Sequence, residues 1–471
     1  MGWRSIILIV ASVAACFAIG WFISTRGAPA DAPVVASAGD CGLSLAGSNT
    51  IGERLAPRLV GAFLTGEGYA VTETAGEGET TLTATRGEEN CAIPIRSHGS
   101  ALSFEELTAG TAQIGMSSRA IRPAEIEALA AAGAGDFAGE AAIAEHVIAL
   151  DGIAIVTHPD NPLRELSREQ VRRLFFGEIA DWTQLGGSPG AVTLYARDDQ
   201  SGTFQFFHEQ VLDKDLRWDA ASANARRFES STELVAAVAA DRNGVGFVGM
   251  AYVTSAVRAM AISDGGPAFT PSEANVRSES YPISRRLYLY VRPETMRANP
   301  HAFALVEFFK GPDAYTIAEE LGYVSLRAAP QTAAVVGAAQ TCEVGAPESQ
   351  TYLAATRGAE RLSSVVRFQA GSNTVDSLAR DDVGRAAAPI QAALEQGRSV
   401  RLIGHSDAEG DADLNRRLAL NRAHAIREAF EARGLMGLLV ESAGERCPVA
   451  GNDTPQGRQS NRRVEIWIGR T

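Results

Sequence analysis

The sequence predicts an α/β protein of more than one domain behind an apolar N-terminal segment. At 471 residues the chain is too long for a single hydrophobic core. Alternating apolar residues over Ala191–Tyr195 predict a strand, and the apolar spacing of residues 204–212 predicts a helix directly after it. Similar strand, polar loop and helix patterns recur through the first three hundred residues.

Composition is that of an ordinary globular protein, with 45% hydrophobic and 21% charged residues. The formal net charge of −13 argues against nucleic acid and anionic membrane surfaces as partners. Any anion that binds must therefore be attracted by local groups, against the overall field of the protein.

Residues 1–25 are predicted to be a signal-anchor or signal peptide. Arg4 precedes the uncharged segment Ser5–Ser24, and about 20 apolar residues suffice for a helix to cross a bilayer. A lipoprotein signal is the alternative, because Val13–Cys16 resembles a lipobox with Cys16 as the modified residue. The chain stays apolar after Cys16, which favours an uncleaved transmembrane helix. Both interpretations place the rest of the protein outside the cytoplasm, after a linker over residues 26–40.

The turn that follows the predicted strand 191–195 has the chemistry of an anion site. Arg197, Ser201, Gly202 and Thr203 lie between the strand end and a helix N-terminus. Free backbone N–H groups and the helix dipole favour an anion there, and a guanidinium matches the geometry of a tetrahedral oxyanion. The alternative is that Ser201 only caps the helix and Arg197 is a surface charge.

Two further hydroxyl-rich loops, 47–50 and 96–100, also precede helical patterns. In the first loop Asn49 or Thr50 is the expected helix cap, and plain capping is the alternative to ligand binding. The pattern also predicts strands at 112–116, 148–157 and 244–248, and helices after Asn161–Pro162 and over 232–240.

Five ordered motifs give this region a family resemblance: 47–50, 114–119, 151–156, 176–182, and Arg197 with 201–203. Together they resemble the periplasmic phosphate-binding proteins of ABC importers. The resemblance implies a two-lobe type II periplasmic-binding-protein fold over about 41–330, with the ligand in the cleft. It implies lobe 1 at about 41–150 and 285–330, lobe 2 at about 151–284, and chain crossings near Asp151 and Arg285–Tyr290.

The same resemblance implies the phosphate-binding residues, which are Asn49, Thr50, Ser97, Ser118, Arg197, Ser201, Gly202 and Thr203. Many family members carry Asp at the position of Ser118. Rejection of sulfate then requires another acid that can accept a phosphate hydroxyl, and our hypothesis is Asp151, with Asp198 and Asp199 as substitutes. The alternative is that Asp151 is a hinge residue bonded to backbone.

The end of the chain has a second resemblance, after a predicted linker at 331–360. A strand pattern ends in Gly404–Asp407, a helical pattern carries Asn415 and Arg422, and the chain closes with a strand over 461–466. Residues 361–471 resemble the small α+β C-terminal domain of outer membrane protein A (OmpA), which binds peptidoglycan. The resemblance implies that Asp407 holds the ammonium and Arg422 the carboxylate of the diamino acid in the peptide. An ion pair between these two residues is the alternative.

Four cysteines lie beyond the N-terminal segment: Cys41, Cys91, Cys342 and Cys447. Export permits their oxidation, and four cysteines allow three pairings. Cys41 and Cys91 flank the first predicted unit and are expected to pair, which leaves Cys342 for Cys447.

Several enzyme classes lack support in the sequence. Residues 244–249 fit G-x-G-x-x-G, but they follow a helix and occupy a strand, which is the wrong context for a dinucleotide. The histidines have no metal-ligand spacing, and no activated nucleophile is visible, so we expect no metal, no cofactor and no enzyme activity.

The expected function is that of an extracytoplasmic phosphate-binding protein of an ABC-type uptake system, tethered to peptidoglycan in the periplasm. Its expected partners are inorganic phosphate, peptidoglycan and the membrane subunits of an ABC importer, without nucleic acid. The alternative is a wall-anchored sensor or structural protein that binds phosphate without delivering it to a transporter.

Overall fold

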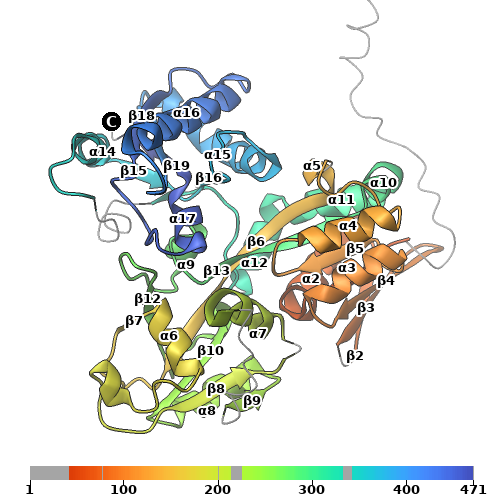
Figure 1. The fold of residues 1–471 in the computed structure, drawn as a ribbon. Coiled ribbons are helices and arrows are strands. Elements are labelled where there is room, and N and C mark those ends of the chain that lie inside the picture. Colours follow the sequence, from red (N-terminus) through yellow and green to blue (C-terminus); the bar gives the residue numbers. More distant parts are fainter. Residues whose placement is uncertain are drawn as a thin grey trace, which may run out of the picture.

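The computed structural model describes residues 42–76, 78–139, 141–199, 201–213, 225–331 and 342–469. Two lobes share one large mixed sheet, and a smaller sheet with its own helices forms a C-terminal domain (Figure 1). The order in the large sheet is β2-β3-β4-β1-β5-β13-β6-β10-β8-β9, with β11 paired to β6. Its strands are β1 (Leu45–Gly47), β2 (Ala70–Gly76), β3 (Glu79–Arg86), β4 (Glu89–Ser97), β5 (Ile114–Ser117), β6 (Glu145–Thr157), β8 (Thr193–Arg197), β9 (Arg226–Phe228), β10 (Gly244–Gly249), β11 (Arg258–Ala259) and β13 (Ser284–Val291).

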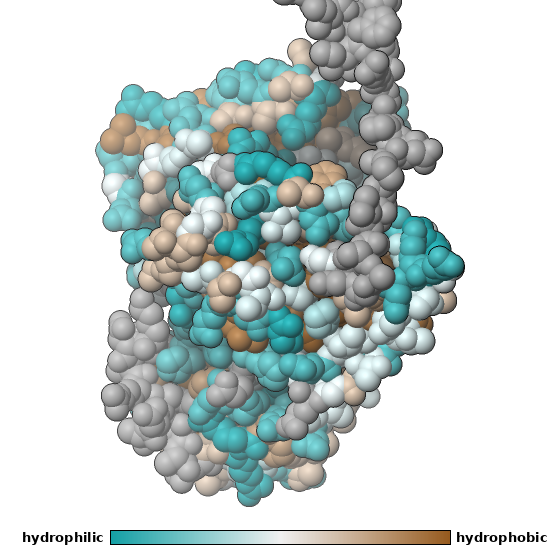
Figure 2. All heavy atoms as spheres, turned by 90° about the vertical axis from the view of Figure 1, so that its right-hand side faces the viewer, coloured by the Kyte–Doolittle hydropathy of each residue, from teal (hydrophilic) through white to brown (hydrophobic). Residues whose placement is uncertain are grey.

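Lobe 1 packs helices against the half of the sheet that runs from β2 to β13. Its core is aliphatic and aromatic, with Leu45, Ile95, Leu305 and Phe309 fully buried. The face drawn in Figure 2 is mostly hydrophilic, with brown residues in scattered patches. The helical elements of lobe 1 are η1 (Ile51–Leu55), α2 (Ala56–Gly66), α3 (Ser100–Ala109), α4 (Pro123–Ala131), α5 (Ala141–Ala144), α10 (Pro293–Ala298), α11 (Pro300–Phe309) and α12 (Pro312–Glu320).

Lobe 2 surrounds the other half of the sheet. Helix α6 begins where Ser167 Oγ accepts from the Gln170 amide (3.0 Å) and Gln170 Oε1 accepts from the Ser167 amide (2.7 Å). Residues 244–249 form the buried strand β10, so the predicted strand is confirmed. The remaining elements are α6 (Arg168–Phe175), η2 (Trp182–Leu185), α7 (Gly202–Phe207), η3 (His208–Asp213), α8 (Ser231–Ala239), η5 (Met250–Tyr252) and α9 (Glu273–Arg277), with the two-stranded sheet of β7 (Glu165–Ser167) and β12 (Ala261–Ser263).

Strand β6 connects the lobes and belongs to both. Its first half pairs antiparallel with β13, and its second half pairs with β10 and β11. It is buried along almost its whole length, which explains its nearly continuous apolar sequence. Asp151 interrupts that run and lies opposite Arg285 of β13. The two places where chain crossings were expected are thus neighbours in the sheet.

The C-terminal domain has a sheet in the order β14-β15-β19-β17-β18, with β16 also paired to β19. Helix α16 packs on β17 and β18, and a buried aliphatic core separates the helices from the sheet. The helix and strand patterns predicted for 361–471 are confirmed. The elements are β14 (Pro330–Gln331), α14 (Pro347–Thr356), β15 (Glu360–Leu362), β16 (Val366–Arg367), α15 (Ser377–Glu395), β17 (Val400–His405), α16 (Ala412–Glu431), β18 (Leu439–Gly444), α17 (Pro455–Asn461) and β19 (Arg463–Ile468).

The expectation of a linker at 331–360 is wrong for its second half. Helix α14 and the start of β15 lie there, and Tyr352 packs its ring 6.1 Å from that of Trp467. Tyr352 is 3% exposed, so α14 is part of the C-terminal domain. The Ala-rich and polar composition hid this helix because it contributes few large apolar side chains to the core.

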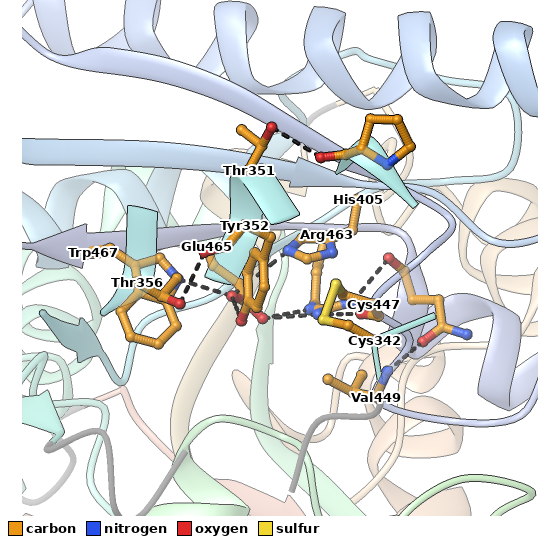
Figure 3. The surroundings of a disulfide bond; sticks show 12 residues. Cys342, Thr351, Tyr352, Thr356, His405, Cys447, Val449, Arg463, Glu465 and Trp467 are labelled. Carbon is orange, nitrogen blue, oxygen red and sulfur yellow. Dashed lines mark hydrogen bonds and ion pairs between the residues drawn. A yellow bond between two sulfur atoms is a disulfide. The ribbon is translucent and has the colours of Figure 1, made fainter. Parts of the chain in front are cut away.

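The predicted disulfide between Cys342 and Cys447 is confirmed (Figure 3). Cys91 is also disulfide-bonded, while Cys41, its predicted partner, lies outside the described residues. The predicted transmembrane helix Ser5–Ser24 and the lipobox at Cys16 lie outside them too. Among the described residues, none of the helices combines the length and apolar character that crossing a membrane requires.

A buried polar cluster lies beside the disulfide (Figure 3). Glu465 accepts from Tyr352 Oη (3.0 Å) and Arg463 Nε (2.8 Å), and His405 Nε2 lies 3.6 Å from its Oε2. Burial opposes the charge of Glu465, yet Arg463 and His405 hold its pKa well below the usual range. Burial also lowers the pKa of His405 to about 4.

His405 should make the C-terminal domain sensitive to mild acid. An unfolded histidine takes up a proton near pH 6.5, whereas folded His405 does so only near pH 4. Between these values the unfolded state binds the extra proton, so stability should fall as pH decreases, by up to about 3 kcal/mol from this group. Urea unfolding at pH 7.5 and pH 5 measures this loss. His405→Gln should reduce it, and the control His424→Gln in α16 should not; equal losses in His405→Gln and wild type would contradict the assignment.

Candidate functional site

A buried ion pair stands at the centre of the molecule, on the two strands that join the lobes. Arg285 donates to Asp151 Oδ2 through Nε (3.0 Å) and Nη2 (2.6 Å), and both side chains are 1% exposed. The alternative interpretation of Asp151, a hinge residue bonded to backbone, does not describe its side chain. Asp151 lies at the crossing, but a guanidinium is its partner.

Arg285 also holds elements of both lobes together. Its Nη1 donates to the Gly202 carbonyl (3.0 Å), and its Nη2 lies within hydrogen-bond distance of the hydroxyls of Thr50 (3.1 Å) and Thr203 (3.2 Å). Thr50 belongs to lobe 1, whereas Gly202 and Thr203 begin α7 in lobe 2. Sequence reasoning named the crossing at 285–290 but not this residue. An arginine pair in the otherwise apolar strand of residues 284–291 was the available signal.

The N-terminus of α7 faces hydroxyl groups of lobe 1 at close range. An ideal Cβ on Gly202 would lie 3.1 Å from Ser118 Oγ and 3.6 Å from the hydroxyl oxygens of Ser48 and Thr50. The absence of a side chain at this glycine allows the lobes to approach this closely. Ser118 is itself held by Ser100, whose Oγ accepts from the Ser118 amide (3.0 Å).

Each of the two interpretations of the turn is right for one residue, since Ser201 caps the helix but Arg197 is buried. Ser201 Oγ does cap α7, since it accepts from the amides of Thr203 (3.2 Å) and Phe204 (3.4 Å). Arg197 is not a surface charge, because it is 7% exposed and donates to Ser231 Oγ (2.5 Å) and to the Phe228 carbonyl (3.2 Å). Burial lowers its pKa, so a neighbouring anion would stabilise its charge.

Most of the polar groups described above line one small cavity between the lobes, whereas Ser48, Ser118 and Gly202 are not among its described lining residues. Three buried oxygens of this region have no hydrogen-bond partner among the described residues, namely Ser48 Oγ, Asn49 Oδ1 and Asp151 Oδ1. Buried polar atoms normally have partners, so these three are available to a ligand. The cavity is lined by Asn49, Thr50, Glu53, Asp151, Arg197, Ser201, Thr203, Gly249, Ala251, Tyr252, Arg285 and Tyr323.

The other predicted residues of lobe 1, Asn49, Thr50 and Ser97, have contacts that differ from the predicted ones. Asn49 and Thr50 do not act as the expected caps in the described chain, because Asn49 Nδ2 donates to the Ser97 carbonyl (2.8 Å) and Thr50 Oγ1 meets Arg285. Ser97 is buried beside Gly52, where a Cβ would lie 2.1 Å from its Oγ, and it is not among the described residues of the cavity wall.

Neither of the two substitute acids is among the described residues that line the cavity, although Asp198 Oδ2 lies 3.8 Å from Arg197 Nη2. Asp199 Oδ1 accepts from Arg227 Nη1 (2.6 Å), and its side chain is 70% exposed. Asp198 Oδ1 accepts from the Ser201 amide (3.1 Å) and so supports the turn. Asp151 is thus the buried acid that lines the cavity.

The chemistry of the cavity is that of anion recognition. Arg197 and Arg285 bring two guanidinium groups to it, and the carboxylate of Asp151 pairs with Arg285. Hydroxyls of Ser201, Thr50 and Thr203 add groups that can donate or accept. The described ranges contain no group of three or more His, Cys, Asp and Glu side chains placed to hold a metal ion.

In the C-terminal domain, Asp407 and Arg422 do not form the ion pair that was the alternative. Asp407 Oδ2 accepts from Arg462 Nη1 (2.7 Å). Arg422 is fully buried, and its three nitrogens donate to the carbonyls of Ser372 (2.8 Å), His405 (3.1 Å) and Gln369 (3.2 Å). Burial lowers the pKa of Arg422 to about 10, while Asp407 opposes that effect. The two residues are thus electrostatic neighbours with separate hydrogen-bond partners.

Two lobes joined by paired strands around a buried polar cavity define a two-lobe solute-binding domain. Residues 71–312, just over half of the chain, match the family model described as a PBP superfamily domain. The chain belongs to this superfamily. Residues 367–462 match the OmpA family. Both sequence resemblances are confirmed.

Several relatives of the first domain are named phosphate-binding protein PstS. That of Pseudomonas aeruginosa is 31% identical over 217 residues, which cover 43% of this chain and 64% of that protein, just under two thirds. That of Staphylococcus haemolyticus is 24% identical over 269 residues, covering 54% of this chain and 81% of that protein. The solved structure of an ABC-type phosphate transport receptor from Vibrio cholerae is 22% identical, with a TM-score of 0.47, and covers 60% of this chain and 99% of that chain.

Proposed function

We propose that the cleft binds inorganic phosphate and that the protein supplies it to an ABC-type uptake system. The observation that carries this proposal is the convergence of Arg197 and Arg285 with hydroxyl groups of both lobes on one buried cavity. The names of the relatives from Pseudomonas and Staphylococcus support the choice of phosphate.

The charges of the cavity suit an oxyanion. Asp151 pairs with Arg285, and the buried Arg197 has the carboxylate of Asp198 3.8 Å from its Nη2, beyond hydrogen-bond distance, so an anion in the cavity can form the closer contact. A guanidinium can donate two parallel hydrogen bonds to adjacent oxygens of a tetrahedral anion. The hydroxyls of Thr50, Ser201 and Thr203 can serve the remaining oxygens, since each donates or accepts.

Removing the charge of Arg197 should strongly weaken phosphate binding. Arg197→Ala deletes a charge-assisted contact in a desolvated site, so we expect a loss of about 3 kcal/mol or more of binding free energy. Isothermal titration calorimetry of the full chain measures the change. The control Arg242→Ala removes an exposed arginine of the same lobe and should leave the affinity unchanged. Absence of phosphate binding by the wild type would end the proposal.

Selection against sulfate is assigned to Asp151 in this proposal. Near neutral pH phosphate carries at least one proton, whereas sulfate carries none. The unpartnered Oδ1 of Asp151 can accept a hydrogen bond from a phosphate hydroxyl, and it repels an anion without a proton. Ser118, which stands where many family members have Asp, offers only a hydroxyl that can equally donate to sulfate.

Asp151→Asn should therefore change the selectivity of the cleft. The amide keeps the shape of the side chain but removes its negative charge, so phosphate binding should weaken and sulfate should begin to compete. Competition calorimetry with sulfate measures both effects. If sulfate already competes equally with phosphate in the wild type, Asp151 does not discriminate between them.

We further propose that the C-terminal domain binds the peptide of peptidoglycan through Asp407 and Arg422. A zwitterionic diamino acid presents an ammonium and a carboxylate, and one carboxylate with one guanidinium can recognise the two at a fixed separation. Asp407 would share its carboxylate between the ligand and Arg462. The match to the OmpA family supports this role.

Co-sedimentation of the full chain with purified peptidoglycan tests this assignment. Asp407→Asn should abolish co-sedimentation because the ammonium loses its counter-charge, and Arg422→Ala should do the same. Arg422 also donates hydrogen bonds to three backbone carbonyls, so its replacement can disturb the fold of the domain. The Asp407 variant is therefore the decisive one. The controls Asp413→Ala and Arg417→Ala alter exposed residues of the neighbouring helix. Wild-type sedimentation of Asp407→Asn would show that the site lies elsewhere.

The remaining parts of the proposal concern place and domain limits. We place the protein in the periplasm, with Ser5–Ser24 as a membrane anchor or Cys16 as a lipid attachment site. We retain the lobe limits near residues 150 and 285.

A second candidate function is a wall-anchored sensor, which the close contact between the two domains favours. Growth of a deletion strain on limiting phosphate separates the two, because only a supplier of the importer is needed for uptake.

A further inference from the structure

The C-terminal domain touches lobe 2 at a backbone contact. The Gly451 amide donates to the Asp264 carbonyl (2.5 Å), and Thr454 Oγ1 donates to Asp264 Oδ2 (3.4 Å). A Cβ on Gly266 would lie 3.3 Å from the Cα of Ala450, so the backbones of these two segments meet without side chains between them.

A second contact lies on β13, the strand that returns from lobe 2 to lobe 1. Arg286 Nε donates to Glu279 Oε1 (2.8 Å), and its Nη2 lies 3.7 Å from Asp382 Oδ2 on α15. Arg367 of β16 donates to Glu279 Oε2 (2.8 Å). Helix α15 also packs against α5 of lobe 1. The C-terminal domain therefore contacts both lobes as well as the strand between them.

The backbone at Glu279 indicates that this contact is closely fitted. Glu279 has a φ of +51° and is the only non-glycine residue with positive φ in the described part of the chain. L-residues disfavour that conformation, and it persists where surrounding contacts fix it. Arg367 provides such contacts, because its Nη2 also donates to the carbonyls of Glu279 (3.0 Å) and Ser278 (3.3 Å). Burial opposes the charge of Glu279, but Arg286 and Arg367 hold its pKa below the usual value.

Neighbouring residues of β13 serve the cleft and the domain contact. Side chains alternate between the two faces of a strand. Arg285 points to Asp151 and the cavity, and Arg286 points to Glu279 and Asp382. A change in the path of β13 must therefore act on both contacts.

We propose that the C-terminal domain is a brace that holds the two lobes in their closed arrangement. It contacts lobe 2 at Asp264 and Gly266, and it contacts lobe 1 and β13 through α15, so rotation of one lobe against the other must disturb one of these contacts. Phosphate, which the proposed function places between the lobes, favours the same closed arrangement. Docking of the domain and phosphate binding should thus strengthen each other by the same factor.

The braced segment also supports the proposed peptidoglycan site. Arg367 Nη1 donates to the Ser460 carbonyl (2.8 Å), and the neighbouring Gln459 accepts a hydrogen bond from Arg462, the partner of Asp407. The loop docked on lobe 2 contributes as well, since Asn452 Oδ1 accepts from the Ala408 amide (3.0 Å). Binding of a ligand at Asp407 can therefore affect the contact between the C-terminal domain and the lobes, because directly contacting residues connect the two.

Weakening the brace away from both ligand sites should weaken phosphate binding. Arg367→Gln removes the charge that holds Glu279, and we expect about a tenfold loss of phosphate affinity and faster dissociation, within the usual range of coupling between sites. The control Arg401→Gln removes a partly exposed arginine of the same domain that pairs with Glu441. Calorimetry and stopped-flow dissociation on the full chain provide the measurements.

Locking the brace provides the converse test. Gly266→Cys combined with Ala450→Cys should form a disulfide across the contact with lobe 2, and phosphate should then dissociate more slowly until a reductant is added. Wild type with and without reductant controls for the native disulfides. Hydrogen exchange at the Gly451 amide, which docking protects, should slow when phosphate is added.

The outcomes separate this inference from the proposed function. If the wild type binds no phosphate, the proposed function fails. If it binds phosphate, but Arg367→Gln and the locked variant have wild-type affinity and dissociation rates, the brace is overturned while the phosphate site stands. Loss of affinity in Arg367→Gln with slower dissociation in the locked variant supports the brace.

Discussion

The ion pair between Arg285 and Asp151 is the interaction on which the rest of the binding domain depends. Both groups are removed from water, so breaking the pair would leave a buried charge without a partner, which typically costs about 3–5 kcal/mol. The pair also sets Arg285 in the position from which it reaches Thr50 and Thr203. One contact between adjacent strands thereby positions hydroxyl groups from two lobes.

The strand β13 carries this interaction into the second domain. Arg285 faces the cavity, whereas Arg286 contacts groups that also contact the C-terminal domain. Two binding modules joined by a long flexible tether would move independently. Here the contact between them lies on the strand that forms the cleft, so the fusion of the two folds has a structural consequence beyond attachment.

Local sequence patterns predicted the elements whose signals are local. Helix α6 has its cap at Ser167, and Val171, Leu174 and Phe175 form one buried stripe, so its sequence alone specifies it. Helix α14 escaped prediction because Tyr352 is its main apolar anchor and packs against a strand more than a hundred residues later.

The candidate site shows the same division. Arg197, Ser201 and Gly202 form one continuous turn, so a short motif sufficed to identify them. Arg285 escaped notice because its partner Asp151 lies 134 residues earlier, and the pairing exists only once β6 and β13 are side by side. Ser97 has a hydroxyl that could bind an anion, but its side chain packs against Gly52. It is not among the described residues that line the cavity, which the sequence alone could not show.

The interrupted course of lobe 1 fixes an order of assembly. Its sheet pairs β5 with β13, and the whole of lobe 2 lies between these strands in the chain. As the chain emerges from its N-terminus, lobe 2 is therefore complete before lobe 1 can close its sheet. The C-terminal domain follows both lobes in the chain, and its disulfide joins Cys342 to a cysteine 105 residues later. The cavity between the lobes can thus form before the domain that rests against it.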